Sequence, residues 1–221
     1  MTKFASILLS ACILTNLGSA APVLPATDVE QDTSARLTVR IYNYAKVHPA
    51  TVEGAERVAG RLFRQAGIET TWLHCALNKQ ELIDNPACER EFGPDSLLIR
   101  IVPERMARKL SSGGSEFGFA ILSEHDSFET EAYVFYDRAK ELAETRIASI
   151  TIVLGHVLAH EMGHLLLGIG QHSSRGLMKA SWKEKELRLA SIGGFVFGPK
   201  QARRIRRDAA KRLAAGKSRA D

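Results

Sequence analysis

An apolar stretch from Ala148 to Leu167 constrains the fold of this chain more than any other feature. Ile, Val, Leu and Ala would lie on every side of the helix that it predicts, which is typical of a helix enclosed in a protein core. Four ionisable residues nevertheless interrupt it, namely His156, His160, Glu161 and His164. Burying such groups costs free energy unless a partner satisfies them. The stretch therefore predicts a buried helix that carries a site.

The centre of this helix reads HExxH from His160 to His164, which is a zinc-binding signature. Four residues make about one helical turn, so both imidazoles project from one face and can bind the same ion. Glu161 lies beside the open coordination position, where it can take a proton from zinc-bound water and pass it to a leaving amine. We expect His160 and His164 to bind one catalytic Zn²⁺ and Glu161 to act as general base.

A tetrahedral catalytic zinc site needs a third protein ligand in addition to water. The nearest candidate is His172, eight residues after His164, provided that the helix ends at Gly168 and the chain folds back. The alternatives are Glu184 and Glu186, which follow His164 by 20 and 22 residues. Gluzincin-type enzymes place a glutamate ligand on a second helix at such a separation, so the choice stays open at this point.

The residues after the helix resemble the end of the metzincin signature, in which a third histidine, a short loop and a methionine-bearing turn follow HExxH. By this resemblance the chain is similar to a metzincin-type zinc metalloprotease of a bacterial secreted variety. The resemblance implies that His160, His164 and His172 are the metal ligands. It further implies that Glu161 is the general base and that Met178 is the methionine of the Met-turn beneath the metal.

The close match covers only about Leu154 to Trp182, and it departs from the family pattern in two ways. In HExxHxxGxxH the third histidine follows the second by six residues, whereas His172 follows His164 by eight. The glycine of the pattern follows the second histidine by three residues, whereas Gly168 follows His164 by four. The family's tyrosine after the Met-turn is also absent, since Lys-Ala-Ser-Trp follows Met178. The group that stabilises the oxyanion therefore stays unassigned.

Three other residues are weaker candidates for the site. His156 lies one turn before His160, but three ligands in a line along one helix cannot surround an ion, so we expect a hydrogen-bonded histidine in the core or beside the ligands. His125 and Tyr136 fall in or near strands that should border the cleft. Either side chain could polarise a substrate carbonyl or simply lie at the surface.

The pattern of the remaining chain predicts an α+β fold, and the resemblance implies that this fold is of the zincin, metzincin-like type. A β-α-β pattern opens the domain and implies a parallel pair of strands. We expect a mixed, mostly parallel five-stranded sheet with two main helices as an upper subdomain over 36–168. A mainly irregular and helical lower subdomain over 169–221 would carry the third histidine and the Met-turn. The expected strands are 37–43, 68–73, 97–102, 117–122 and 132–136, and the first helix runs over 51–66 from a Thr51 cap.

The N-terminus has the layout of a secretory signal peptide, with Lys3 before an apolar run to Leu17 and then small residues. We expect a signal peptide over 1–20, a loose leader over 21–35, and export to the periplasm or the extracellular space. Cys12 also fits a bacterial lipobox, which would give a lipid-anchored form instead. Apart from the signal we expect no membrane segment, because a lone helix with four ionisable residues suits lipid poorly.

Export makes the remaining cysteines informative. With Cys12 removed, only Cys75 and Cys88 remain in the mature chain. An oxidising compartment favours a disulfide between them, and the alternative is two unpaired thiols. A zinc–thiolate site is not expected, because the chain has no CxxC pair.

Basic charge is concentrated at the C-terminus. Residues 199–221 carry nine Lys and Arg against two Asp, while the whole chain has a net charge of only +5. The rest of the chain is thus slightly acidic, and we do not expect nucleic acid as a partner. The segment predicts an amphipathic helix from Pro199, for which weak association with anionic surfaces is a secondary hypothesis.

Together these features predict a secreted zinc endopeptidase that acts on a peptide or protein substrate as a monomer. The substrate would lie extended along an edge strand, for which 117–122 is the candidate. The alternative is a non-catalytic secreted binding domain that keeps the zincin shape and a structural metal. The longer spacing to His172 motivates this alternative, whereas the presence of Glu161 speaks against it.

Overall fold

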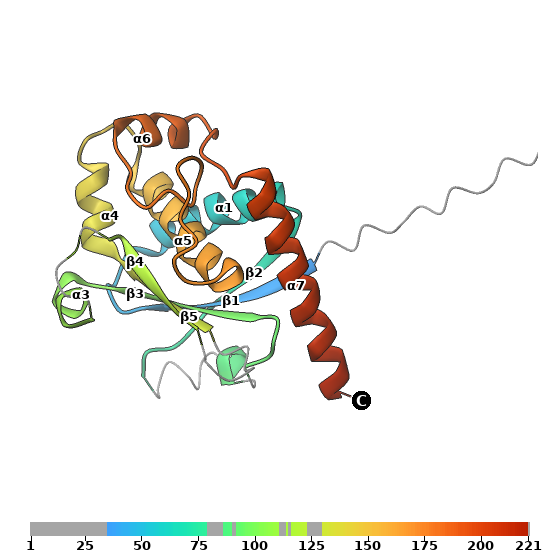
Figure 1. The fold of residues 1–221 in the computed structure, drawn as a ribbon. Helices are drawn as coiled ribbons and strands as arrows, with labels where there is room; N and C mark the ends of the chain where they lie inside the picture. Colours follow the sequence, from blue (N-terminus) through green and yellow to red (C-terminus); the bar gives the residue numbers. More distant parts are fainter. Residues whose placement is uncertain are drawn as a thin grey trace, which may run out of the picture. The chain divides into compact units, whose positions relative to one another are not determined.

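The computed structural model describes residues 35–78, 86–89, 92–110, 114, 116–122 and 130–220. The predicted signal peptide and leader, the lipobox with Cys12, and His125 lie outside these residues. Within them the chain has the predicted α+β architecture with a five-stranded mixed sheet, together with six α-helices (Figure 1).

The sheet has the strand order β2-β1-β3-β5-β4. All neighbouring pairs are parallel except β4 and β5, so the opening β-α-β unit has the predicted parallel pair and β4 is an antiparallel edge strand. Such an edge leaves backbone N–H and C=O groups free for pairing with another chain. The strands are β1 (Ala35–Asn43), β2 (Ile68–His74), β3 (Ser96–Val102), β4 (Gly118–Leu122) and β5 (Thr130–Phe135).

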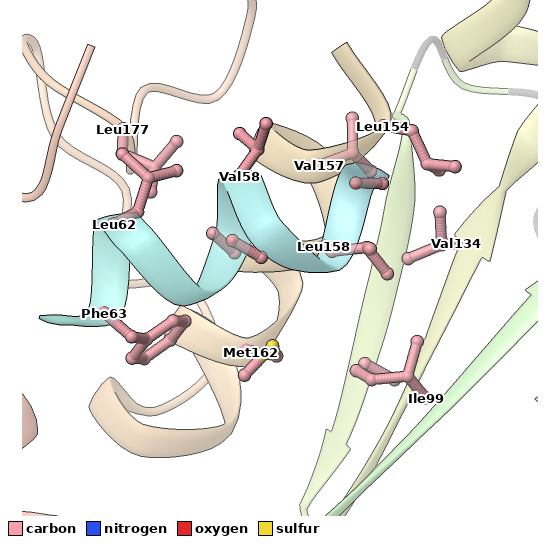
Figure 2. Packing of buried hydrophobic residues seen from close by; sticks show 14 of the residues in the cluster. Val58, Leu62, Phe63, Ile99, Val134, Leu154, Val157, Leu158, Met162 and Leu177 are labelled. Atoms are coloured by element: carbon pink, nitrogen blue, oxygen red, sulfur yellow. The ribbon is translucent and has the colours of Figure 1, made fainter. Parts of the chain in front are cut away.

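Two long helices, α1 (Pro49–Gln65) and α5 (Ile150–Leu167), pack against each other beside the sheet and build the core. Val58 of α1 lies against Gly155 of α5, and Figure 2 shows Leu62 of α1 beside Leu177 and Val134 of the sheet beside Leu158 of α5. Every residue of α5 from Val153 to its end is buried, as the all-round apolar pattern predicted. Among the described residues α5 alone is long and apolar enough to cross a membrane, and 83% of it is buried inside the protein.

Two element boundaries differ from the sequence-based expectation. The first helix begins at Pro49 and not at Thr51, because His48 caps it by accepting a hydrogen bond from the Ala50 N–H at 3.3 Å. Proline at the first helical position is common, since its missing N–H would have no partner there. Tyr136 starts a helix and does not end a strand. The shorter helices are η1 (Pro86–Glu89), α3 (Glu104–Leu110), α4 (Tyr136–Ala143) and α6 (Glu184–Ser191).

The predicted disulfide between Cys75 and Cys88 is present. Cys75 directly follows β2, and Cys88 lies in η1. The bridge therefore ties the end of the outer strand β2 to the segment that leads into β3.

The basic C-terminal segment forms α7 (Pro199–Ala220), which packs on α5 and β1. Three of its arginines donate hydrogen bonds to carbonyls at the ends of the two core helices. These bonds are Arg206 to Ala66 O at 2.8 Å, Arg204 to Leu167 O at 2.7 Å and Arg212 to Leu165 O at 3.1 Å. Carbonyls in a last helical turn lack helical donors and carry partial negative charge. Part of the basic charge of the tail therefore neutralises helix ends inside the fold.

Candidate metal centre

Three imidazoles converge at the C-terminal half of α5. The Nε2 atoms of His160 and His164 lie 3.1 Å apart, and those of His164 and His172 lie 3.2 Å apart. The ligand atoms of all three residues lie within 4.8 Å of one another. Two nitrogens that each bind tetrahedral Zn²⁺ at about 2.1 Å are themselves about 3.4 Å apart. The three histidines thus form a group that could bind a metal, and their spacing fits zinc.

His172 reaches this group from a loop that follows α5. The helix ends with Gly168, and the chain reverses through Gly170, whose φ of +73° is a conformation that only glycine adopts freely. A Cβ added at Gly170 would meet no described heavy atom within 4 Å beyond its chain neighbours, so its backbone conformation and not crowding is what favours glycine there. The longer spacing to the third histidine therefore does not prevent the convergence.

His160 is held in the tautomer that suits a metal ligand, and both imidazoles of the helix are neutral. Nδ1 of His160 lies 2.8 Å from the Leu177 carbonyl, which can only accept, so Nδ1 carries the proton and Nε2 presents its lone pair to the group. Burial lowers the pKa of both His160 and His164 to about 4. Both rings are therefore neutral at pH 7, as a metal ligand must be.

Met178 lies directly beneath the helix at the site. It is fully buried, and a Cβ on Gly163 would come within 2.6 Å of the Met178 sulfur. The preceding carbonyl, that of Leu177, is the one that orients His160. Met178 is thus packed against α5 at Gly163, the residue before His164, and its role as the methionine of a Met-turn stays a prediction.

Glu161 faces the same cleft with an unpartnered carboxyl group. Its side chain is buried, and Oε2 has no hydrogen-bond partner among the described residues. Burial raises the pKa of Glu161 to about 8. A buried acid without a partner is costly, and a cation held by the neighbouring imidazoles would favour its ionised form.

The edge strand β4 forms one wall of this cleft, whose volume is about 490 Å³. Its first residue, Gly118, lies so close to Glu161 that an added Cβ would be 2.8 Å from Glu161 Cδ. Trp182 also lines the cleft, and its ring is nearly perpendicular to that of His160 at a centroid distance of 5.7 Å. Sequence reasoning assigned no role to Gly118 or Trp182, because the only signals were a glycine at the start of a strand and an aromatic residue after the Met-turn.

The rival candidates lie away from the metal group. Glu186 accepts hydrogen bonds from Lys179 Nζ at 2.6 Å and from the Lys183 N–H at 2.9 Å, and Glu184 forms an exposed ion pair with Arg188. Neither glutamate belongs to the histidine group.

The other two described residues that sequence reasoning considered also stand apart. His156 is a core residue whose Nδ1 bonds to the Ile152 carbonyl and whose ring stacks on Phe195. Tyr136 is not among the residues that line the cleft. The group that stabilises an oxyanion thus has no assignment among these residues.

Comparison with known proteins adds little to this picture. No family model matches the sequence, and no curated protein matches it either. Among solved structures, the fold is similar to that of archaemetzincin from Methanopyrus kandleri, with 15% sequence identity and a TM-score of 0.47. The similarity covers 80% of this chain and 98% of that one. At this level we draw no conclusion from the likeness, and the site is interpreted from its own geometry.

Proposed function

We propose that this chain is an exported, zinc-dependent endopeptidase. The observation that carries the proposal is the convergence of three imidazole Nε2 atoms beside an unpartnered buried carboxyl group, in a cleft with a free strand edge. A purely structural zinc site has four protein ligands and no use for a neighbouring carboxylate, whereas a catalytic site keeps one position open. The disulfide supports export, because such bonds persist in oxidising compartments.

In this proposal His160, His164 and His172 hold the metal ion. A bound Zn²⁺ would supply Lewis-acid polarisation of a carbonyl and a lowered pKa for water. Imidazole nitrogens suit zinc better than they suit calcium or magnesium, which prefer oxygen ligands. The Leu177 carbonyl keeps His160 in the required tautomer, and Met178 supports the helix from below.

Glu161 moves the proton in the hydrolysis. Its carboxylate accepts a proton from water while the water oxygen bonds to the carbonyl carbon of the substrate. The C–N bond then breaks, and the same proton passes from Glu161 to the leaving nitrogen. The closeness of Glu161 to Gly118, at the start of the edge strand β4, supports a substrate peptide that pairs with this strand.

The test compares zinc content and peptide cleavage for the wild type, Glu161→Gln and a matched control. Glu184→Gln is a suitable control, because Glu184 is exposed and outside the cleft. We expect one zinc per chain in all three proteins and hydrolysis of a broad peptide library by the wild type and the control. Loss of a general base should lower the rate by about 10²- to 10⁴-fold in Glu161→Gln.

Two outcomes would overturn the proposal. Absence of zinc from the wild-type protein would remove the metal site altogether. Stoichiometric zinc without cleavage of any library peptide would instead favour the non-catalytic binding domain.

A further inference from the structure

His172 is the least constrained of the three histidines. It is exposed, whereas His160 and His164 are buried, and it lies on a loop that turns through two glycines with positive φ. Ordering such a loop costs conformational entropy, and the cost grows with loop length. The chain from His164 to His172 is two residues longer than in HExxHxxGxxH, so ordering it costs more conformational entropy. Contacts that hold this loop would offset that cost.

One guanidinium group on α7 spans this loop from its beginning to its end. Arg204 donates from Nη2 to the carbonyl of Leu167, the last residue of α5, at 2.7 Å. It donates from Nη1 to Oε1 of Gln171, the residue before His172, at 2.8 Å. A planar guanidinium holds two acceptors in a fixed relative geometry, which a single-point donor such as Lys cannot do.

The same helix holds the other neighbour of His172. Gln201, nearly one turn before Arg204, donates from Nε2 to Ser173 Oγ at 3.1 Å. Its Oε1 accepts from the Gly198 N–H at 2.8 Å, which fixes the orientation of the amide. The Ser173 N–H in turn donates to the Met178 carbonyl at 2.8 Å and joins the loop to the Met-turn.

The helix that supplies these contacts is itself anchored in the fold. Ile205 and Ala209 are fully buried, and Arg206 and Arg212 bond to backbone carbonyls at the ends of α1 and α5. We propose that α7 positions the third metal ligand, with Arg204 and Gln201 as positioning residues that hold Gln171 and Ser173 on either side of His172. The inference rests on the proposed function only in that these histidines bind a metal.

The experiment measures Zn²⁺ affinity by competition with a chromophoric chelator for the wild type, Arg204→Ala and Arg203→Ala. Arg203 is the matched control, since it is exposed on the same helix and has no bond partner among the described residues. Residues that orient a metal ligand typically contribute 10- to 100-fold in affinity. Because Arg204 acts through the loop and not on the imidazole itself, we expect about a 10-fold loss in Arg204→Ala and no change in Arg203→Ala.

A second measurement separates positioning from a general effect on folding. In a His172→Ala background, Arg204→Ala should leave Zn²⁺ affinity unchanged, because the ligand that it positions is gone. With Co²⁺ bound, Arg204→Ala should move the visible spectrum toward that of His172→Ala, whereas Arg203→Ala should match the wild type.

Equal losses of affinity with and without His172 would overturn the inference, as would unchanged affinity in Arg204→Ala. Failure of the wild type to bind Zn²⁺ would instead refute the proposed function. The two failures are therefore distinguishable.

Discussion

Arg212→Ala tests whether the C-terminal helix is an integral part of the fold or a solvated basic surface. The Arg212 side chain is only 5% exposed. It pairs with Asp208 at 2.8 Å and donates to the carbonyls of Leu165 and Pro94 at 3.1 and 3.3 Å. Alanine would remove these bonds together and leave two backbone acceptors without this donor.

The expected cost follows from these contacts. Breaking a buried ion pair from one side typically costs about 3–5 kcal/mol. The value here should lie near the lower end, about 3 kcal/mol, because Asp208 is one-third exposed and a cavity of about 350 Å³ beside Arg212 can admit water to the freed carbonyls. With a slope of about 2 kcal/mol per molar urea, the unfolding midpoint should fall by about 1.5 M.

The assay is equilibrium urea unfolding followed by circular dichroism, with Arg207→Ala as the control. Arg207 is exposed on the same helix and has no bond partner among the described residues, so its removal should change the free energy of unfolding by less than about 0.5 kcal/mol. A cost below about 1 kcal/mol for Arg212→Ala would refute the reasoning, since α7 would then behave as a surface helix.

Two further predictions concern the cleft and the loop beside it. Gly118→Ala should abolish hydrolysis and leave zinc content unchanged, because the new Cβ would lie 2.2 Å from the Tyr133 carbonyl and 2.8 Å from Glu161 Cδ; full activity would contradict the close approach. Burial disfavours ionised Glu186, but hydrogen bonds from Lys179 and backbone N–H groups outweigh it and lower the pKa of Glu186 from 4.5. Its contribution to stability is therefore present above about pH 4.5 and lost as pH falls through the lower folded-state pKa. Glu186→Gln should flatten the pH dependence of urea unfolding in that range, and an unchanged profile would contradict this.

The burial of α5 and the proximity of His160 and His164 could be predicted from the sequence because their evidence is local. The two histidines of HExxH are about one helical turn apart and so share a face of the helix. The apolar residues on all sides of the helix already require that the helix is buried. The choice between His172 and Glu186 was not local, because it depends on the path of a loop. Spacing could not show that the carboxylate of Glu186 already accepts hydrogen bonds from Lys179 and from a backbone N–H.

The short helices α3 and α4 were missed for a related reason. They have seven and eight residues, and helices this short depend on tertiary packing more than on their own propensity. The roles of the α7 arginines were equally inaccessible, since the bond from Arg206 to Ala66 joins residues 140 positions apart. A run of basic residues looks the same in sequence whether its charges face water or helix ends.

The position of α7 along the chain sets an order of events during synthesis. His160, His164 and His172 all precede Gln201 and Arg204, so a growing chain contains every ligand before it contains the residues that hold the third one. A chain that ended before α7 would carry the complete HExxH motif and His172, but it would lack the contacts from Gln201 and Arg204 to the residues on either side of His172. The contacts that Gln201 and Arg204 make with the His172 loop can therefore form only after α7 has been made, and they are among the last contacts of this region to become available as the chain grows.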